Sequence, residues 1–259
     1  MAERGETEGV GIPPAELVRK SDPDRFSAAM AGSELARRVL FPVYAFNIEV
    51  ARAPWMSKEP LIAEMRLTWW RDALEEIQQG LPVRRHEVAT PLAEVINAEG
   101  AAILSDLVDA RRWDIGTEPH VTVKMLIEYL DRTAGNLMWA GARMLGADAE
   151  AEDDVRDLAR GIGLVRYLAA VPTLEARGKR PLPLGTNVAN LAEAVLDDMP
   201  EMPIKDILPR PARAALYEAT GAKQALAEVV RSPKKVERGQ VALPTLRRRA
   251  GLIKRSFGF

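Results

Sequence analysis

The chain has no cysteine and only two histidines among its 259 residues. Without cysteine there is no disulfide, no thiolate metal site and no cysteine nucleophile, and such a composition is typical of proteins in a reducing compartment. We therefore expect a cytoplasmic location. His86 and His120 lie in different segments without partners at metal-ligand spacing, so no zinc site is expected.

Long apolar runs and an excess of one charge are also missing. No stretch approaches the ~18 apolar residues of a membrane-spanning helix, although peripheral attachment at the inner membrane face stays open. The 36 basic and 37 acidic residues give a formal charge of -1, which argues against nucleic-acid binding. The sequence contains no serine-hydrolase pattern and no Gly-rich phosphate loop. Gly161 and Gly163 fall inside a helical pattern, where we expect them to allow close helix packing.

Helical periodicity dominates what is present. Apolar residues recur at spacings of three and four, and strand-like alternation is nearly absent. No linker or repeat interrupts residues 13–230, so we expect one domain, with a disordered tail at 1–12 and a basic segment at 231–259. The sequence predicts an all-α, single-domain helix bundle. Helices are expected over Ser33–Arg52, Glu59–Gln79, Pro91–Asn97, Ala101–Arg112, His120–Gly146, Asp153–Val171, Ala189–Asp197 and Pro211–Val230.

Two local features modify these helices. Pro42 lies inside the first of them, where it removes a backbone hydrogen bond and predicts a kink or a restart. Trp69 and Trp70 are adjacent and cannot both face the core of a helix bundle. We expect both to be partly buried against neighbouring helices; the alternative is that one lines a cavity or lies at the surface.

Four segments carry, in order and spacing, the motifs of one enzyme family. "RRVLFPVYAFNIEVAR" and "MRLTWWRDALEEIQQG" resemble the amino-terminal part of the squalene and phytoene synthases. "EYLDRTAGNLMWAGARMLG" resembles their central helix, and "GIGLVRYLAAVPTLEARGKRPLPLG" resembles the helix and loop of their second aspartate motif. The resemblance covers roughly residues 22 to 185. It implies an isoprenoid-synthase-like bundle around a central cavity.

The resemblance also implies where metal ligands would lie. These synthases ionise prenyl diphosphates with Mg²⁺ held between two aspartate motifs that face each other across the cavity. Aligned on the Tyr-Ala-Phe run, the first motif corresponds to Ala51 and Trp55. Aligned on the later Arg-Gly and Leu-Pro pairs, the second corresponds to Ala170 and Leu174. None of these side chains binds a metal, so the resemblance implies a pseudoenzyme without catalytic residues, metal or cofactor.

An Asp-Asp-x-x-Asp pattern does occur elsewhere, from Asp153 to Asp157. Thirteen residues separate Asp157 from Ala170, which is about 20 Å along a helix. Carboxylates that share a metal ion must lie much closer together. We expect these acidic residues instead to favour the start of a helix through its dipole.

The resemblance leaves a candidate pocket without metals. The residues expected to line it by position are Tyr44, Asn47, Glu49, Arg166 and Tyr167. A nearby basic loop could contact an anionic headgroup or phosphate, or could simply be exposed, and its residues are Arg177, Lys179 and Arg180. The bulky ring of Trp55 suggests that the cavity is filled. An open polar cavity between the helices carrying Ala51 and Ala170 would favour an enzyme.

The carboxy-terminal segment combines basic and apolar residues. Such a segment can lie on an anionic membrane or on a partner; the alternatives are a solvated tail and a helix packed on the body. The apolar residues are Leu246, Leu252 and Ile253. The candidate membrane or partner contacts are Arg247, Arg248, Arg249, Lys254 and Arg255.

Three functional hypotheses follow. Among non-catalytic relatives the chain resembles assembly factors of respiratory complex I. These proteins have a segment similar to "AFNIEVA" and also lack the aspartate motifs. The leading hypothesis is a pseudoenzyme in complex I assembly that holds a partner polypeptide or an isoprenoid-like lipid near a membrane. The alternative is an active Mg²⁺-dependent prenyltransferase that joins two prenyl diphosphates head to head, using displaced carboxylates such as Glu49, Asp153 and Asp157 or metal-free phosphate binding by arginines. A third is a lipid carrier without a protein partner.

Overall fold

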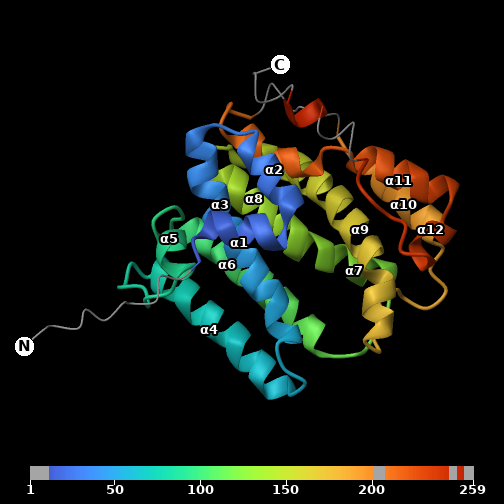
Figure 1. Cartoon of the computed structure of the whole chain (residues 1–259), viewed down its shortest axis with the longest axis horizontal. Coiled ribbons are helices and arrows are strands. Elements are labelled where there is room, and N and C mark those ends of the chain that lie inside the picture. Colours follow the sequence, from blue (N-terminus) through green and yellow to red (C-terminus); the bar gives the residue numbers. More distant parts are fainter. Residues whose placement is uncertain (1–11, 201–207, 245–249, 254–259) are drawn as a thin grey trace, which may run out of the picture.

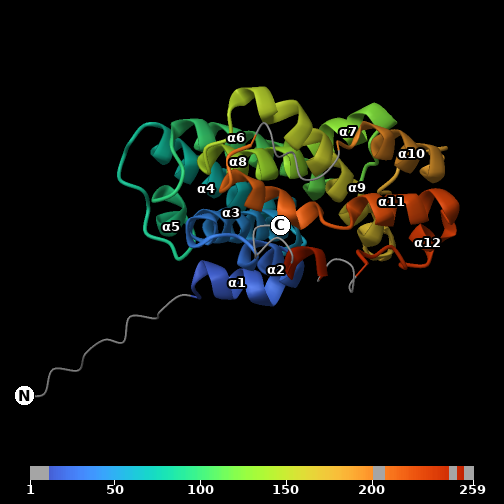
Figure 2. The same ribbon diagram turned by 90° about the horizontal axis from the view of Figure 1, so that it is seen from above.

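The computed structural model describes residues 12–200, 208–244 and 250–253. Within these ranges the regular structure is entirely helical, and the helices pack into one bundle (Figures 1 and 2). The predicted all-α, single-domain fold is confirmed. None of the helices in these ranges is long and apolar enough to cross a membrane.

Two short helices that the sequence analysis did not predict open the bundle. They are α1 (Pro14–Ser21) and α2 (Pro23–Met30), and each starts with a proline, whose missing N–H has no partner at that position anyway. The Asp22 side chain caps α2 by accepting a hydrogen bond from the Arg25 amide. Helix α1 packs on α3 (Glu34–Arg52), and α2 packs on the 3₁₀ helix η5 (Ala212–Ala219).

Helices α3 and α8 (Asn136–Met144) form the centre of the bundle (Figure 1). Helix α3 begins where predicted, with the Ser33 hydroxyl accepting from the Ala36 amide. It continues without interruption through Pro42, so the predicted restart does not occur. Gly141 on α8 allows α3 to approach closely, because a Cβ there would lie 3.0 Å from Leu40 Cδ2.

The second part of the bundle contains α4 (Pro60–Gln78), α5 (Ala89–Ala93) and α6 (Ala98–Arg111). Two 3₁₀ turns, η1 (Ala53–Trp55) and η2 (Arg112–Ile115), follow α3 and α6. On α4, Trp70 is buried and Trp69 is partly exposed, with their ring centroids 4.9 Å apart. Trp69 packs against the core and also lines a surface pocket.

The helix predicted over His120–Gly146 is interrupted. Helix α7 (Val123–Leu130) leads into a π-helical turn, η3 (Asp131–Gly135), before α8 begins. Thr122 caps α7 by accepting from the Met125 amide, so this helix starts later than predicted. Within the π turn the Thr133 hydroxyl donates to the Tyr129 carbonyl oxygen over 2.7 Å, which satisfies an acceptor near the irregular turn.

The final part of the chain packs against α9 (Glu152–Ala176) and contains α10 (Val188–Asp198), α11 (Ala222–Arg231) and α12 (Lys234–Glu237). The single helix predicted over Pro211–Val230 is wrong. Gly221 adopts a left-handed φ of 93° and separates η5 from α11. Around the carboxy terminus, Leu252 is buried, which shows that part of the basic segment packs on the body.

Candidate functional site

A cavity of about 300 Å³ opens between η1, α3, η3 and α9. Ala51 and Trp55 lie on one wall, and Ala170 and Leu174 lie on another. The four positions at which the resemblance places metal-binding aspartates therefore line one cavity. Trp55 forms part of the wall and leaves the cavity open, contrary to the expectation that its ring fills the space.

Basic side chains dominate the polar lining. Four arginines and a single carboxylate line the cavity: Arg25, Arg111, Arg166, Arg177 and Asp114. Two further carboxylates, Asp22 and Glu218, lie behind the arginines and partly neutralise them. This distribution favours an anionic ligand over a cation.

The base of the cavity is a buried network of two arginines and two carboxylates. Arg25 Nε lies 2.6 Å from Glu218 Oε2, and Arg25 Nη1 lies 3.0 Å from Asp22 Oδ2. Arg166 Nη1 donates to Asp22 Oδ2 over 2.8 Å, and its Nη2 lies 3.3 Å from Glu218 Oε2. Burial alone would raise the pKa of Asp22, but Arg166 and Arg25 hold this pKa well below its ordinary value. The network ties α2, α9 and η5 together.

Tyr44 lies beneath this network rather than on the cavity wall. Its ring centroid is 5.5 Å from the Arg25 guanidinium carbon, and its side chain is buried. Within the described part of the chain, the Tyr44 hydroxyl has no hydrogen-bond partner. Burial raises the pKa of Tyr44, and the neighbouring Glu218 raises it further, so the phenol is neutral.

A second charged group occupies the opposite side of the cavity. The Tyr129 hydroxyl donates to Asp114, with separations of 2.9 and 3.0 Å to its two carboxylate oxygens. Arg111 Nη1 lies 2.8 Å from this hydroxyl and 3.1 Å from Asp114 Oδ2. Burial lowers the pKa of Arg111, but Tyr129 and Asp114 outweigh that effect and raise it. Asp114 is therefore fully engaged by its two partners.

The basic loop that follows α9 meets the cavity at Trp55. The Arg177 guanidinium carbon and Lys179 Nζ each lie 4.9 Å from the Trp55 ring centroid, which is the geometry of a cation–π contact. Lys179 Nζ also donates to the carbonyl oxygens of Asp114 and Gly116. Desolvation lowers the pKa of Lys179.

The predicted pocket residues do not all meet. Asn47, Arg166 and Tyr167 line the cavity, and the Tyr167 hydroxyl donates to the Pro181 carbonyl oxygen. Glu49 faces a different pocket and accepts from Arg52 Nη1 over 3.0 Å. Of the predicted anion contacts, Arg177 lines the cavity and Lys179 lies beside it. Arg180 is exposed, with its guanidinium 3.4 Å from Glu118.

Several residues that line the cavity were not predicted from the sequence. Arg25 belongs to a helix that was not predicted, and Arg111 and Asp114 lie outside the motifs that carried the resemblance. Tyr129 lies inside one of those motifs, but nothing in the motif marked it as a lining residue. The alternation of charge with apolar residues in these segments is ordinary for surface helices, so it gave no signal. The predicted membrane or partner contacts Arg247, Arg248, Arg249, Lys254 and Arg255 lie outside the described residues.

The donor set of the cavity does not fit Mg²⁺. A hard divalent cation needs several oxygen ligands, and the lining offers one carboxylate, which is already held by Arg111 and Tyr129. Over the described ranges, no three His, Asp or Glu side chains are grouped so that they could hold a metal ion. Asp153 and Asp154 lie in the first turn of α9, where helix-dipole stabilisation was predicted, and Asp157 pairs with Arg160 at 2.8 Å.

The histidines are packed in aromatic clusters. His120 stacks on Trp113 with centroids 4.7 Å apart, and it is buried. His86 lies 4.9 Å from Trp69 and 5.2 Å from Trp70 between ring centroids. Both histidines contribute to packing.

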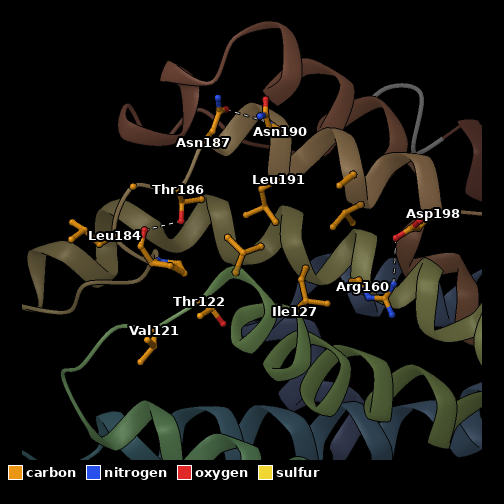
Figure 3. A pocket seen from close by; sticks show the side chains of 15 residues that line it. Val121, Thr122, Ile127, Arg160, Leu184, Thr186, Asn187, Asn190, Leu191 and Asp198 are labelled. Atoms are coloured by element: carbon orange, nitrogen blue, oxygen red, sulfur yellow. Dashed lines mark hydrogen bonds and ion pairs between the residues drawn. The ribbon is translucent and has the colours of Figure 1, made fainter.

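A second concavity, of about 420 Å³, lies between α7, α10 and the loop at residues 183–187 (Figure 3). Its floor is mainly apolar, with Ile127 and Leu191 pointing into it from opposite sides. Arg160 and Asp198 lie together at one end, 3.9 Å apart. We refer to this surface as the α7–α10 groove.

A model of the squalene/phytoene synthase family matches residues 18–198 of the chain. Curated relatives include complex I assembly factor 6 of Homo sapiens, 26% identical over 172 residues that make up 65% of this chain and 51% of that protein. The Drosophila melanogaster homolog is 29% identical over 177 residues, covering 64% of this chain and 51% of that protein. The chain thus spans about half the length of the curated relatives it matches.

Solved structures show the same fold. A ligand-bound dehydrosqualene synthase superimposes with a TM-score of 0.72 at 17% identity, covering 94% of both chains. A squalene synthase from Alicyclobacillus acidocaldarius superimposes with a TM-score of 0.59 at 14% identity, covering 94% of this chain and 90% of that one. At these identities the superpositions support the fold and not a shared reaction.

Proposed function

Because the chain belongs to the squalene/phytoene synthase family, we propose that it acts as a non-catalytic member of that family in the assembly of respiratory complex I. The relatives named as complex I assembly factor 6 support this role. The family model covers residues 18–198, which include most of the residues that line the cavity.

The observation that carries the proposal is the chemistry of the cavity wall. The positions that the resemblance assigns to aspartates hold Ala51, Trp55, Ala170 and Leu174. At Trp55 a neutral aromatic ring contacts Arg177 and Lys179, and no carboxylate is present there to hold a metal ion. A diphosphate leaving group therefore lacks the divalent cations that would neutralise it in a synthase.

A second role, binding an isoprenoid-like lipid with an anionic headgroup, is favoured by one specific observation. The cavity is open, and four arginines line it beside apolar side chains such as Ala51, Ala170 and Leu174. The same arginines also support the prenyltransferase alternative in its form without metal. The two alternatives differ in turnover: a carrier retains the lipid, whereas a synthase releases pyrophosphate.

Deletion of the gene in its own host tests the proposed role. Assembled complex I is expected to fall, measured by native gel electrophoresis and NADH oxidation in membranes, while squalene, hopanoid and carotenoid levels stay unchanged. Reintroducing the wild-type gene should restore complex I. Normal complex I in the deletion strain would contradict the proposal.

Assays on the purified protein test whether it has prenyltransferase activity. With farnesyl or geranylgeranyl diphosphate and Mg²⁺, no pyrophosphate release above that of the buffer is expected. Release that disappears in an Arg177→Gln variant, which removes a lining arginine outside the buried network, would establish the prenyltransferase instead. Native mass spectrometry of the same preparation distinguishes a retained prenyl lipid from an empty cavity.

A further inference from the structure

The α7–α10 groove has the physical character of a protein-docking site. Helix α10 has 11 residues, so it extends about 16 Å, or three turns. Ile127, Leu191 and Val195 supply apolar side chains to the groove from the two facing helices. Helices that dock in a groove use apolar anchors at spacings of three, four and seven residues, and a three-turn groove matches that length.

Large apolar side chains remain exposed at the rim of the groove. Leu184 has 102% relative exposure and Val121 has 75%, and both lie at the open end shown in Figure 3. Val123 is exposed by 39%. Val123 and Ile127 are four residues apart on α7 and therefore share one helix face, and both line the groove. Apolar surface gathered around a concavity is typical of an interaction site.

The charged residues at the other end of the groove indicate the charge that a partner side chain would carry there. Arg160 is shared by three carboxylates: its nitrogens lie 2.9 Å from Asp131, 2.8 Å from Asp157 and 3.9 Å from Asp198. Asp131 and Asp157 lie outside the groove lining and hold Arg160 at the shorter distances, so among the described residues Asp198 is the least compensated carboxylate at this end. Asp198 keeps 64% of its side chain exposed and faces the groove. A lysine or arginine side chain of a partner would complement this exposed carboxylate.

From the apolar floor, the exposed rim and the acidic end, we propose that the α7–α10 groove binds an amphipathic helical segment of a partner protein. The segment presents apolar residues to Ile127 and Leu191 and a lysine or arginine to Asp198. The proposal goes beyond the role in complex I assembly and does not depend on it, since it concerns a surface separate from the central cavity. It also gives Asp157 a role, because this carboxylate holds Arg160 at the end of the groove, 2.8 Å away.

Two synthetic helical peptides of about three turns test the proposal. Both carry leucines at i, i+3 or i+4 and i+7; one has lysines in its end turns, and the matched peptide has glutamates there. Binding to the full chain is measured by fluorescence anisotropy. The lysine peptide is expected to bind at least fivefold more tightly than the glutamate peptide, and equal binding of the two would overturn the proposal.

Groove variants locate the binding. Ala194 is exposed and lines the groove, so Ala194→Gln places a polar amide in it and is expected to weaken binding of the lysine peptide at least fivefold. Glu193→Gln, one residue away and outside the lining, should leave this binding unchanged. Asp198→Asn is expected to weaken it about two- to fivefold, the range of one partly exposed ion pair. Asp197→Asn is its matched control. Thermal unfolding verifies that each variant is folded.

The same variants exclude other occupants. Light scattering measures self-association, and sedimentation with phosphatidylcholine–phosphatidylglycerol vesicles measures membrane binding. If Ala194→Gln abolishes a dimer or vesicle binding and leaves peptide affinity unchanged, the groove serves a second copy or a membrane and the proposal is wrong. Loss of peptide affinity alone supports it.

Discussion

His120 shows how packing alters the chemistry of a single residue. The ring is 3% exposed and lies between Trp113 and Tyr129, with centroids 4.7 and 5.0 Å away. Its Nε2 atom is buried without a hydrogen-bond partner in the described residues. Burial lowers the pKa of His120, although the Asp114 carboxylate acts in the opposite direction. A proton therefore binds the unfolded chain more tightly than the folded chain at this position.

This pKa shift predicts a pH dependence of stability. As the pH falls below about 6.5, the usual histidine pKa, the unfolded state takes up a proton first, so the free energy of unfolding decreases. Urea denaturation between about pH 7.5 and 5.5 is expected to show a larger loss for the wild type than for His120→Gln. The two curves should run parallel above this window, where the imidazole is neutral in both states. Parallel curves throughout would contradict the shift.

At the scale of helices, Gly163 sets the distance between α9 and the π turn η3. A Cβ at position 163 would lie 2.7 Å from Ala134 Cβ, closer than such atoms approach. Gly161 makes a similar close contact with Met199. The prediction that these two glycines allow close packing is therefore confirmed, and the packing contact outweighs the low helix propensity of glycine.

The Gly163→Ala variant tests this contact. Alanine favours a helix by about 1 kcal/mol, but overpacking against Ala134 is expected to reverse the sign and destabilise the protein by about 1–3 kcal/mol. Chemical denaturation gives the free energy of unfolding. Gly116→Ala is the control, because the nearest atom to its Cβ would be 3.8 Å away and its φ of -71° suits alanine. A stabilised Gly163→Ala variant would show that the helices can move apart at no cost.

Some helix boundaries can be predicted from local sequence signals, and others cannot. Helix α3 begins at its Ser33 cap because the capping hydroxyl and the apolar spacing are both local signals. The π turn at Asp131–Gly135 was missed, since the apolar spacing through it resembles that of an α-helix. The break at Gly221 was missed because helix C-caps and mid-helix glycines look alike in a sequence.

For the whole molecule, the network of Arg25, Arg166, Asp22 and Glu218 connects the start, middle and end of the described chain. Glu218 lies on η5 and is 1% exposed, and its carboxylate contacts both arginines. Removing one partner of a buried ion pair leaves the other charge uncompensated, which typically costs about 3–5 kcal/mol. The network is therefore expected to stabilise the packing of α2, α9 and η5 at the base of the cavity.

Glu218→Gln tests this expectation. The free energy of unfolding should decrease by about 3–5 kcal/mol, measured by denaturant titration followed by circular dichroism. Glu16→Gln removes the carboxylate of the Arg19 pair, in which the two side chains are 34% and 55% exposed, and should change the stability far less than Glu218→Gln does. Equal small effects of both variants would mean that Glu218 does not hold the network together.

The sequence by itself determined the helical class, most helix positions and the neutral side chains at the four motif positions. These follow from local rules: hydrogen bonds close within four residues, and a motif keeps its spacing along one helix. Only the tertiary structure decided that the cavity is open, that arginines line it and that Glu49 faces elsewhere. Arg25 and Glu218 lie near opposite ends of the chain, and their pairing depends on how α2 packs on η5. Side-chain periodicity specifies which face of a helix is apolar, but the position of a charge relative to distant charges is fixed only when the helices pack.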